Sequence, residues 1–429
     1  MARGAVSAEA YTRACLDRIA AIEGEVQAFA HLDPEYAIAQ ARERDEWRQT
    51  GREIGPLHGV PVGIKDIIDT ADYPTECGSP LMAGRRPRRD ATVVAKLRAA
   101  GAVIIGKTVT TEFAYFHPGK TRNPHDPTHT PGGSSSGSAA AVAAGMVPLA
   151  IGSQTNGSVI RPASYCGTFA MKPSHGLVSR AGVLPLSRSL DHVGPFARTL
   201  DDLALILDTI TGHDPSDPDT RPLAAPAFQS VLAQDPPMPP RYAFMRTPIW
   251  DRKITADAAE AFAELIGAVG ERCDTVELPE HFAGAWEAQR KIMATEMAHN
   301  LGAMVDRGGE ASSKKLRDLL AGGREVAAGD YLTALDHGRE LAGSLAGYFE
   351  LYHAIITPAA PGVAPGLETT GDPAFCTLWT LTGLPAVTLP LLKGENGLPI
   401  GVQLIGPPGD DARLLRTARA LLGTLAGTE

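Results

Sequence analysis

Three short segments rich in glycine or proline each carry a reactive side chain, and they constrain this chain more than any other feature. Their sequences are Gly59-Val-Pro-Val-Gly-Ile-Lys65-Asp66, Pro131-Gly-Gly-Ser134-Ser-Ser-Gly137 and Gly152-Ser-Gln-Thr-Asn-Gly-Ser158-Val-Ile-Arg161-Pro162. Glycine reaches backbone dihedrals that strain other residues, and it lets a ligand approach the main chain closely. A serine is a weak nucleophile by itself, so these segments require a base whose pKa lies near the working pH.

Lys65 is the candidate base. It follows an apolar run that predicts a buried strand, and burial disfavours the charged ammonium. A lysine considered alone is more often found at the surface or in an ion pair, but the apolar run and the two serine segments reverse that expectation. Asp66 points to the opposite face of the predicted strand and receives no catalytic role. The pattern therefore favours Ser–Ser–Lys over Ser–His–Asp chemistry.

The three segments resemble those of the amidase signature family, whose members include bacterial malonamidases and the amidase subunit of glutamyl-tRNA amidotransferase. The resemblance continues through Cys166-Gly, Met171-Lys-Pro, Ser187-Arg-Ser-Leu-Asp-His-Val-Gly and Gly397-Leu-Pro-Ile-Gly-Val-Gln, and so covers nearly the whole chain. It implies an amidohydrolase that cleaves a carboxylic amide C–N bond through a serine acyl-enzyme. Lys65 would be the base, Ser134 the relay serine after a cis peptide bond, and Ser158 the nucleophile.

The segment around Ser158 is implied to form an oxyanion hole from the backbone N–H groups of Thr155, Asn156, Gly157 and Ser158. Two residues depart from the commoner family pattern, since Gln154 replaces an aspartate and Asn156 replaces a glycine. Asparagine tolerates left-handed backbone better than most residues, so we expect the turn to be kept.

Arg161 lies three residues after Ser158 rather than two, an arrangement similar to that of the bacterial malonamidases. Its guanidinium matches a carboxylate bidentately, which would favour a small substrate bearing a carboxylate near the scissile amide. The alternative is an arginine that braces the serine loop through backbone carbonyls or a buried acid. The sequence leaves both open.

The alternation of helical and apolar segments predicts an α/β fold. The resemblance implies a single large domain over residues 1–429, with a mixed central β-sheet sandwiched by helices. A proline-rich stretch at 214–240 predicts a surface connector. We expect a variable region around 285–345 to line the substrate pocket. Predicted helices cover 7–49, 91–100, 138–144, 255–272, 284–306 and 330–352, and predicted strands cover 102–105, 147–151, 354–357, 387–391 and 400–405.

The composition argues against several other classes of protein. With 429 residues and 44% hydrophobic content the chain can bury a large core, and its net charge of −9 gives no basic footprint for a nucleic acid. The longest apolar stretch is too short to span a bilayer, and no secretory signal is visible. Five scattered cysteines and unpatterned histidines indicate neither disulfides nor a metal site, and fit a cytoplasmic protein without cofactor. We expect a small-molecule amide as partner, no nucleic acid and no membrane, with a homodimer left open.

Other interpretations remain at this point. Gly133-Ser-Ser135-Ser-Gly137 formally matches the nucleophile elbow of α/β-hydrolases, which would make the chain an esterase using Ser135, but this leaves Lys65 unexplained. The chain could instead be one component of a tRNA-linked amidotransferase complex, or an inactive binding protein on the same fold. Asp191-His192 is interpreted as a structural turn and Cys166 as a small packed residue.

Overall fold

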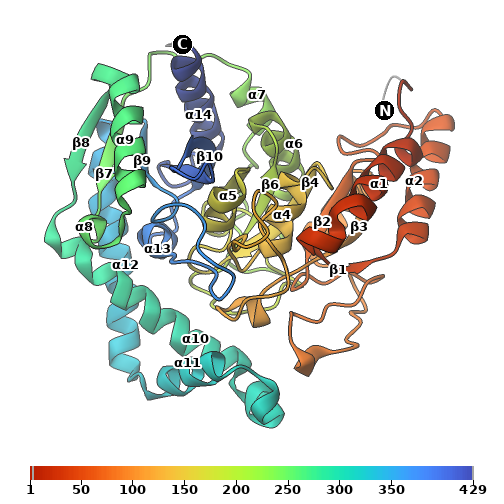
Figure 1. Ribbon diagram of the computed structural model, residues 1–429, viewed down its shortest axis with the longest axis horizontal. Coiled ribbons are helices and arrows are strands. Elements are labelled where there is room, and N and C mark those ends of the chain that lie inside the picture. Colours follow the sequence, from red (N-terminus) through yellow and green to blue (C-terminus); the bar gives the residue numbers. More distant parts are fainter. Residues whose placement is uncertain (2–3, 428–429) are drawn as a thin grey trace.

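A mixed β-sheet of eleven strands runs through the computed structural model, which describes Met1 and residues 4–427 (Figure 1). The strands are β1 (Phe29–Leu32), β2 (Pro61–Lys65), β3 (Val103–Thr108), β4 (Leu149–Gln154), β5 (Phe169–Lys172), β6 (His192–Ala197), β7 (Tyr242–Arg246), β8 (Cys273–Glu277), β9 (Ala354–Pro358), β10 (Ala386–Lys393) and β11 (Pro399–Ile405). Their order across the sheet is β1-β3-β2-β4-β6-β5-β10-β11-β9-β7-β8. Strand β2 pairs in parallel with both β3 and β4, whereas β4, β6, β5, β10 and β11 pair antiparallel in turn.

Helices cover the sheet. They are α1 (Ala8–Val26), α2 (Pro34–Gln49), α3 (Thr92–Ala99), α4 (Ser136–Ala143), α5 (Ile160–Cys166), α6 (Leu200–Ile210), α7 (Phe228–Leu232), α8 (Trp250–Lys253), α9 (Ala256–Val269), α10 (Ala285–Gly308), α11 (Lys314–Glu325), α12 (Ala328–Ala346), α13 (Ala374–Leu381) and α14 (Asp411–Ala426). Short 3-10 helices are η1 (Pro80–Met82), η2 (Glu112–Ala114), η3 (Gly270–Arg272), η4 (Glu280–Gly284), η5 (Gly309–Ala311) and η6 (Gly347–Glu350). Helices α10, α11 and α12 form an arm at the lower left of Figure 1.

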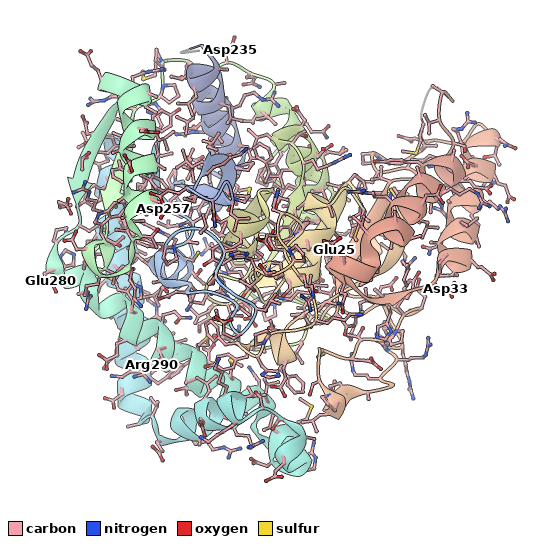
Figure 2. All side chains as sticks on the ribbon, in the orientation of Figure 1. Glu25, Asp33, Asp235, Asp257, Glu280 and Arg290 are labelled. Carbon is pink, nitrogen blue, oxygen red and sulfur yellow. The ribbon has the colours of Figure 1, made fainter. Side chains whose placement is uncertain are left out.

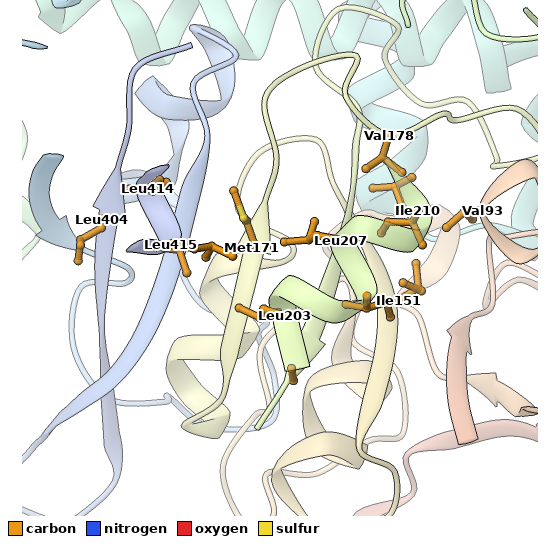
Figure 3. Close-up of a cluster of buried hydrophobic side chains, with 14 of the residues drawn as sticks. Val93, Ile151, Met171, Val178, Leu203, Leu207, Ile210, Leu404, Leu414 and Leu415 are labelled. Carbon is orange, nitrogen blue, oxygen red and sulfur yellow. The ribbon is translucent and has the colours of Figure 1, made fainter. Parts of the chain in front are cut away.

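The two faces of β4 belong to different parts of the core, as the two-residue period of a strand requires. Leu149 and Ile151 join the largest hydrophobic cluster, which also holds the buried side of α6 and α14. Figure 3 shows Ile151 in this cluster, together with Leu207 of α6 and Leu415 of α14. Ala150 joins a second cluster with the alanines of α4. The central strands are therefore buried on both faces.

Helix α4 is composed of small residues because it lies deep in the protein. Ser136 to Val142 are all buried. A Cβ on Gly137 would lie 2.2 Å from the carbonyl oxygen of Ala28 and 2.4 Å from the amide nitrogen of Val109. The glycine and serines of this segment thus allow the backbone of α4 to approach its neighbours, besides delivering Ser134 to its N-terminal end.

The predicted α/β fold with a mixed sheet between helices is confirmed, but several local predictions were wrong. The predicted helical stretch 7–49 is interrupted by β1, and α11 was not predicted. The stretch 214–240 is not simply an exposed connector, since it contains α7, whose Phe228 and Leu232 are buried against the core. These elements depend on contacts with distant segments, which local periodicity does not report.

Charged side chains lie over the outside of the fold. Figure 2 shows Asp33, Asp235 and Glu280 there, and all three are exposed. No described helix is both long enough and apolar enough to cross a membrane.

The centre of the sheet should tolerate no added methyl group at Gly194 of β6. A Cβ there would lie 2.2 Å from the carbonyl oxygen of Met171 on the neighbouring β5. We expect Gly194→Ala to lower the thermal unfolding midpoint by several degrees, since overpacking costs about 1–3 kcal/mol. Gly267→Ala is the control, because that exposed position on α9 has open space and a helical alanine is favoured. Equal midpoints for the two variants would contradict this packing.

Candidate active site

Lys65 lies at the end of β2 and is completely buried. Its Nζ lies within hydrogen-bond distance of Ser134 Oγ at 2.7 Å and of Ser153 Oγ at 2.8 Å, with the Ser153 carbonyl oxygen at 3.5 Å. None of the ion pairs among the described residues includes Lys65, whereas the neighbouring Asp66 pairs with Lys107. Burial lowers the pKa of the Lys65 amine well below its usual value. The site thus favours a neutral amine in contact with a serine hydroxyl.

The two serines of the predicted relay line one cavity. Ser134 precedes α4, and the Gly133–Ser134 peptide bond is cis, as the resemblance implied. Ser158 lies in the turn between β4 and α5 and is 9% exposed. Both serines line a cavity of about 20 Å³. The structure therefore brings Lys65, Ser134 and Ser158 together from three separate segments.

The turn before α5 presents backbone donors to this cavity. Thr155, Asn156, Gly157 and Ser158 all line it. Outside helices and strands, none of the hydrogen bonds among the described residues is donated by the N–H groups of Asn156, Gly157 or Ser158. These N–H groups thus have no backbone acceptor among those hydrogen bonds, as the donors of an oxyanion hole would require.

The two departures from the family pattern have clear structural roles. Gln154 Oε1 accepts hydrogen bonds from the N–H groups of Val159 and Ile160, and so caps the start of α5 as a carboxylate would. Asn156 does not adopt the left-handed backbone that we expected to explain its presence. Its side chain instead donates to Gln289 of α10 and accepts from Thr377 of α13. Asparagine here joins the turn to two helices.

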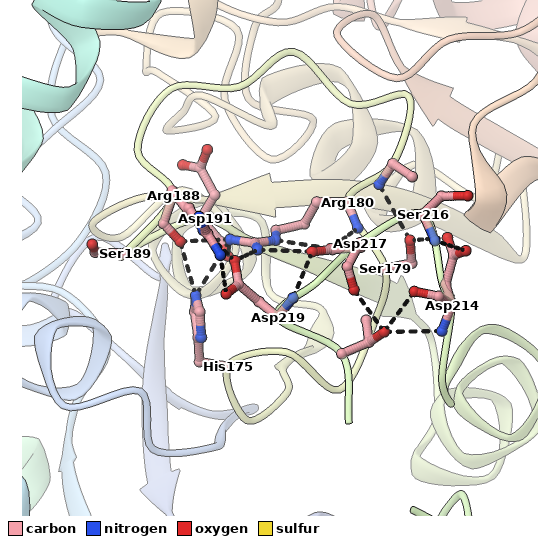
Figure 4. Close-up of polar contacts among 12 residues, drawn as sticks. His175, Ser179, Arg180, Arg188, Ser189, Asp191, Asp214, Ser216, Asp217 and Asp219 are labelled. Carbon is pink, nitrogen blue, oxygen red and sulfur yellow. Dashed lines mark hydrogen bonds and ion pairs between the residues drawn. The ribbon is translucent and has the colours of Figure 1, made fainter. Parts of the chain in front are cut away.

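Asp191 supports the same turn from the other side. Its Oδ1 accepts a hydrogen bond from Thr155 Oγ1 at 2.6 Å, and its Oδ2 accepts from the N–H groups of Leu186 and Ser187. Desolvation raises the pKa of the Asp191 carboxyl to about 6. Figure 4 shows Asp191 beside the ion-pair network in which Arg180 joins Asp217 and Asp219. The interpretation of this segment as structural stands, but its local sequence does not indicate the contact with Thr155.

His192 lies on β6, beside the strand that carries Ser153. His192 Nδ1 hydrogen-bonds with the carbonyl oxygen of Leu190, and burial lowers the pKa of its ring well below the usual value. Ser153 and Asp191 both line a second cavity of about 320 Å³. Ser153 was missed by the sequence reasoning, although its place in the Gly152-Ser-Gln motif could have marked it.

Arg161 is only 2% exposed and lines the cavity beside Ser158. One terminal nitrogen donates to the carbonyl oxygen of Gly133 at 2.6 Å and to Thr370 Oγ1 at 3.4 Å. Its Nε and its other terminal nitrogen are buried without a hydrogen-bond partner. No described carboxylate hydrogen-bonds to it, and the nearby Asp372 pairs with Lys253. The arginine therefore braces the serine loop through Gly133, and its Nε and second terminal nitrogen can still donate hydrogen bonds to a ligand.

The prediction that residues 285–345 line the substrate pocket is only partly correct. Of residues 285–345, Met293 of α10 lines the cavity beside Ser158, while α11 and α12 contribute no lining residue. The opposite wall is formed by Ala114, Tyr115 and Phe116, which the sequence reasoning did not select. These residues carry no catalytic group, and only the fold brings them to the site.

The position of Ser135 does not support the alternative in which it is the nucleophile of an α/β-hydrolase elbow. This serine is fully buried, and its hydroxyl donates to the carbonyl oxygen of Ser153 and accepts from the N–H of the same residue. Cys166 is also buried, and burial raises the pKa of its thiol. Among residues that the structure describes, no group of three or more His, Cys, Asp or Glu side chains could hold a metal ion.

Comparisons with known proteins agree with this geometry. The family model described as Amidase matches residues 10–415. The chain is 38% identical over 462 residues to the A subunit of the glutamyl-tRNA(Gln) amidotransferase from Chloroflexus aurantiacus, covering 98% of this chain and 94% of that one.

Solved structures are similar over the same length. The native peptide amidase from Stenotrophomonas maltophilia superposes with a TM-score of 0.87 at 31% identity, covering 99% of this chain and 94% of that chain. A structure described as revealing the evolutionary origins of an s-triazine catabolic enzyme through a vestigial protein complex has a TM-score of 0.92 at 31% identity, with 99% and 96% covered.

Covalent labelling should distinguish the two serines that the sequence offered as nucleophile. We expect a fluorophosphonate to form a single adduct that peptide mapping places on Ser158, because Ser158 faces the cavity whereas the Ser135 hydroxyl is fixed between two backbone groups. Ser135→Ala should still be labelled and Ser158→Ala should not. An adduct on Ser135 would overturn this assignment.

Proposed function

The chain belongs to the amidase family, and we propose that it hydrolyses a small carboxylate-bearing amide with Lys65, Ser134 and Ser158 as its catalytic residues. It is an enzyme that cleaves amide C–N bonds. The observation that carries the proposal is the contact at 2.7 Å between the Lys65 amine and the Ser134 hydroxyl, in a site where burial lowers the pKa of the amine well below its usual value.

The proton relay follows from the contacts of Lys65. A neutral amine has two N–H donors and one lone pair. The two oxygens of Ser153 can take the donors, which leaves the lone pair for the hydroxyl proton of Ser134. Ser134 in turn takes the proton of Ser158 as the Ser158 oxygen attacks the carbonyl carbon.

The remaining steps use the turn before α5. Negative charge on the carbonyl oxygen is stabilised by the backbone N–H groups of Thr155, Asn156, Gly157 and Ser158, each such donor contributing ~3 kcal/mol. The relay then passes the proton to the leaving nitrogen, the C–N bond breaks, and an acyl-enzyme forms on Ser158. Water attacks this ester by the reverse proton path, which releases the carboxylate and restores the serine.

The class of substrate is proposed from Arg161. A buried guanidinium with unpartnered N–H groups is costly, because a desolvated charge needs a counter-charge and its donors need acceptors. A carboxylate on the substrate would supply both within the cavity that Ser158 lines. The bond to Gly133 keeps the arginine in place, so bracing and binding are compatible.

The second candidate function is that of one component in a tRNA-linked amidotransferase. It is favoured by the similarity to amidotransferase A subunits over almost the whole chain. That function would require partner proteins and glutamine as the amide. The similarity to a peptide amidase over the same length favours an amide hydrolase instead. Assays of the purified chain with glutamine and with malonamate separate the two.

The relay predicts a pH dependence that Lys65 controls. The deprotonated amine is the active form, so kcat/KM for an uncharged amide should fall as pH falls through the lowered pKa of Lys65. Lys65→Met should lose about 10²–10⁴-fold of activity. Lys96→Met is the matched control, since that lysine of α3 also has a pKa lowered by burial but bonds only to the carbonyls of Ile210 and Thr211. Wild-type activity in Lys65→Met would exclude the relay.

The role of Arg161 is tested by comparing a charged with a neutral substrate. We expect Arg161→Gln to lower kcat/KM for malonamate by about 100- to 1,000-fold, which is the scale for removing a desolvated charged partner. The value for butyramide, a neutral amide of similar size, should fall much less. Thermal unfolding of the variant controls for the lost bond to Gly133. Equal losses for both amides would mean that Arg161 only braces the loop.

A further inference from the structure

Asp191 and Lys65 reach the same segment of the chain from the two strands that flank β4. Lys65 ends β2, and its Nζ lies 2.8 Å from the Oγ of Ser153 on β4. On the other side, the antiparallel register of β4 and β6 continues past the ends of both strands, so Thr155 comes opposite Asp191. The hydrogen bond of 2.6 Å between their side chains agrees with this register. Ser153 and Asp191 also line one cavity of about 320 Å³.

Neither Lys65 nor Asp191 has a partner of opposite charge in direct contact. None of the ion pairs among the described residues includes either of them. The neighbouring Arg180 is paired with Asp217 and Asp219, as Figure 4 shows. The Asp191 carboxylate instead accepts hydrogen bonds from one hydroxyl and two backbone N–H groups. Neutral donors therefore hold this negative charge, and no cation cancels it.

The charges around Lys65 act on it in opposite directions. Burial lowers the pKa of Lys65, the charge of Asp191 raises it, and the charge of Arg161 on α5 lowers it. Cys77, in the loop after β2, also faces Lys65, but burial raises the pKa of its thiol to about 12 and so keeps it uncharged. For Asp191 itself, desolvation raises the pKa and Arg180 acts against that effect. Among these groups, Asp191 is the one whose charge favours an ammonium at Lys65.

The proposed relay creates such an ammonium. When Lys65 takes the hydroxyl proton of Ser134, an N–H bond forms, an O–H bond breaks, and the amine becomes positively charged. The Oγ of Ser134 and the two oxygens of Ser153 lie within 3.5 Å of the nitrogen and can accept its three N–H groups. They supply no counter-charge, and in a medium of low dielectric constant an opposite charge acts strongly even without contact.

We propose that Asp191 is a positioning residue of the relay, whose negative charge stabilises the ammonium of Lys65 while its bond to Thr155 holds the turn that carries the nucleophile. This inference rests on the proposed function, because it needs Lys65 as the base. Without the charge of Asp191, the pKa of Lys65 would fall further, and a base whose pKa lies far below the working pH accepts a proton poorly. The carboxylate would thus offset part of the effect of burial.

The test is the pH dependence of the rate at which a fluorophosphonate labels Ser158, which needs the relay but no particular amide. In the wild type this rate should rise with pH to a plateau, with its midpoint at the pKa of Lys65. Asp191→Asn removes the charge and keeps the size of the side chain. Its midpoint should move to lower pH by roughly one unit, the lower end of the effect of an opposite charge at close range, and its plateau should fall.

Asp411→Asn is the matched control. The Asp411 carboxylate on α14 also accepts hydrogen bonds from a backbone N–H and a hydroxyl, both of Ser174, and burial likewise raises its pKa. This variant should lose thermal stability but keep the wild-type labelling midpoint. Asp191→Glu retains the charge, so it should also keep the midpoint, with a lower plateau because the longer side chain displaces Thr155.

The position of the midpoint separates the possible outcomes. If Asp191→Asn lowers the plateau but keeps the wild-type midpoint, Asp191 only braces the turn and the proposal is overturned. Asp191→Ser, a second uncharged variant, decides in the same way if the asparagine variant does not fold. If Lys65→Met labels Ser158 with the rate and pH profile of the wild type, Lys65 is not the base and the proposed function itself is wrong.

Discussion

The contact between the Lys65 amine and the Ser134 hydroxyl is the interaction on which the rest of this site depends. An ammonium group at this depth would need a carboxylate, and no described carboxylate hydrogen-bonds to Lys65. Serine hydroxyls and a carbonyl can satisfy the hydrogen bonds of a neutral amine, but they supply no counter-charge for an ammonium. The strand that carries Lys65 lies between two parallel neighbours, so the backbone that carries the amine has a fixed position inside the sheet.

The turn that carries Ser158 is held by side chains from several parts of the chain. Gln154 caps the helix that follows it, and Asp191 holds Thr155 from the segment before β6. Gln289 ties the turn to α10. Donors that stabilise a transition state must be in place before charge develops, and these contacts provide that preorganisation. Thr155 and Asn156, which these contacts hold, also line the cavity beside Ser158.

Where the sequence reasoning failed, the missing information was a contact between distant residues. Asn156 was explained by backbone conformation, yet its side chain bonds to Gln289 and Thr377, more than a hundred residues away. Strand β1 was predicted as part of a helical stretch because it is short and takes its place only by pairing with β3. Phe116 carries no catalytic chemistry, so nothing in its local sequence distinguished it from a core aromatic residue.

The sequence by itself determined the fold class, the three segments of the candidate site and the side chains proposed to react. Glycine, proline and serine at fixed spacing leave few alternatives, and an apolar run before Lys65 already indicates a buried base. Only the tertiary structure decided what Arg161 touches and which side chains line the cavity. These properties depend on distances between segments far apart in the chain, which only the packing of the folded protein fixes.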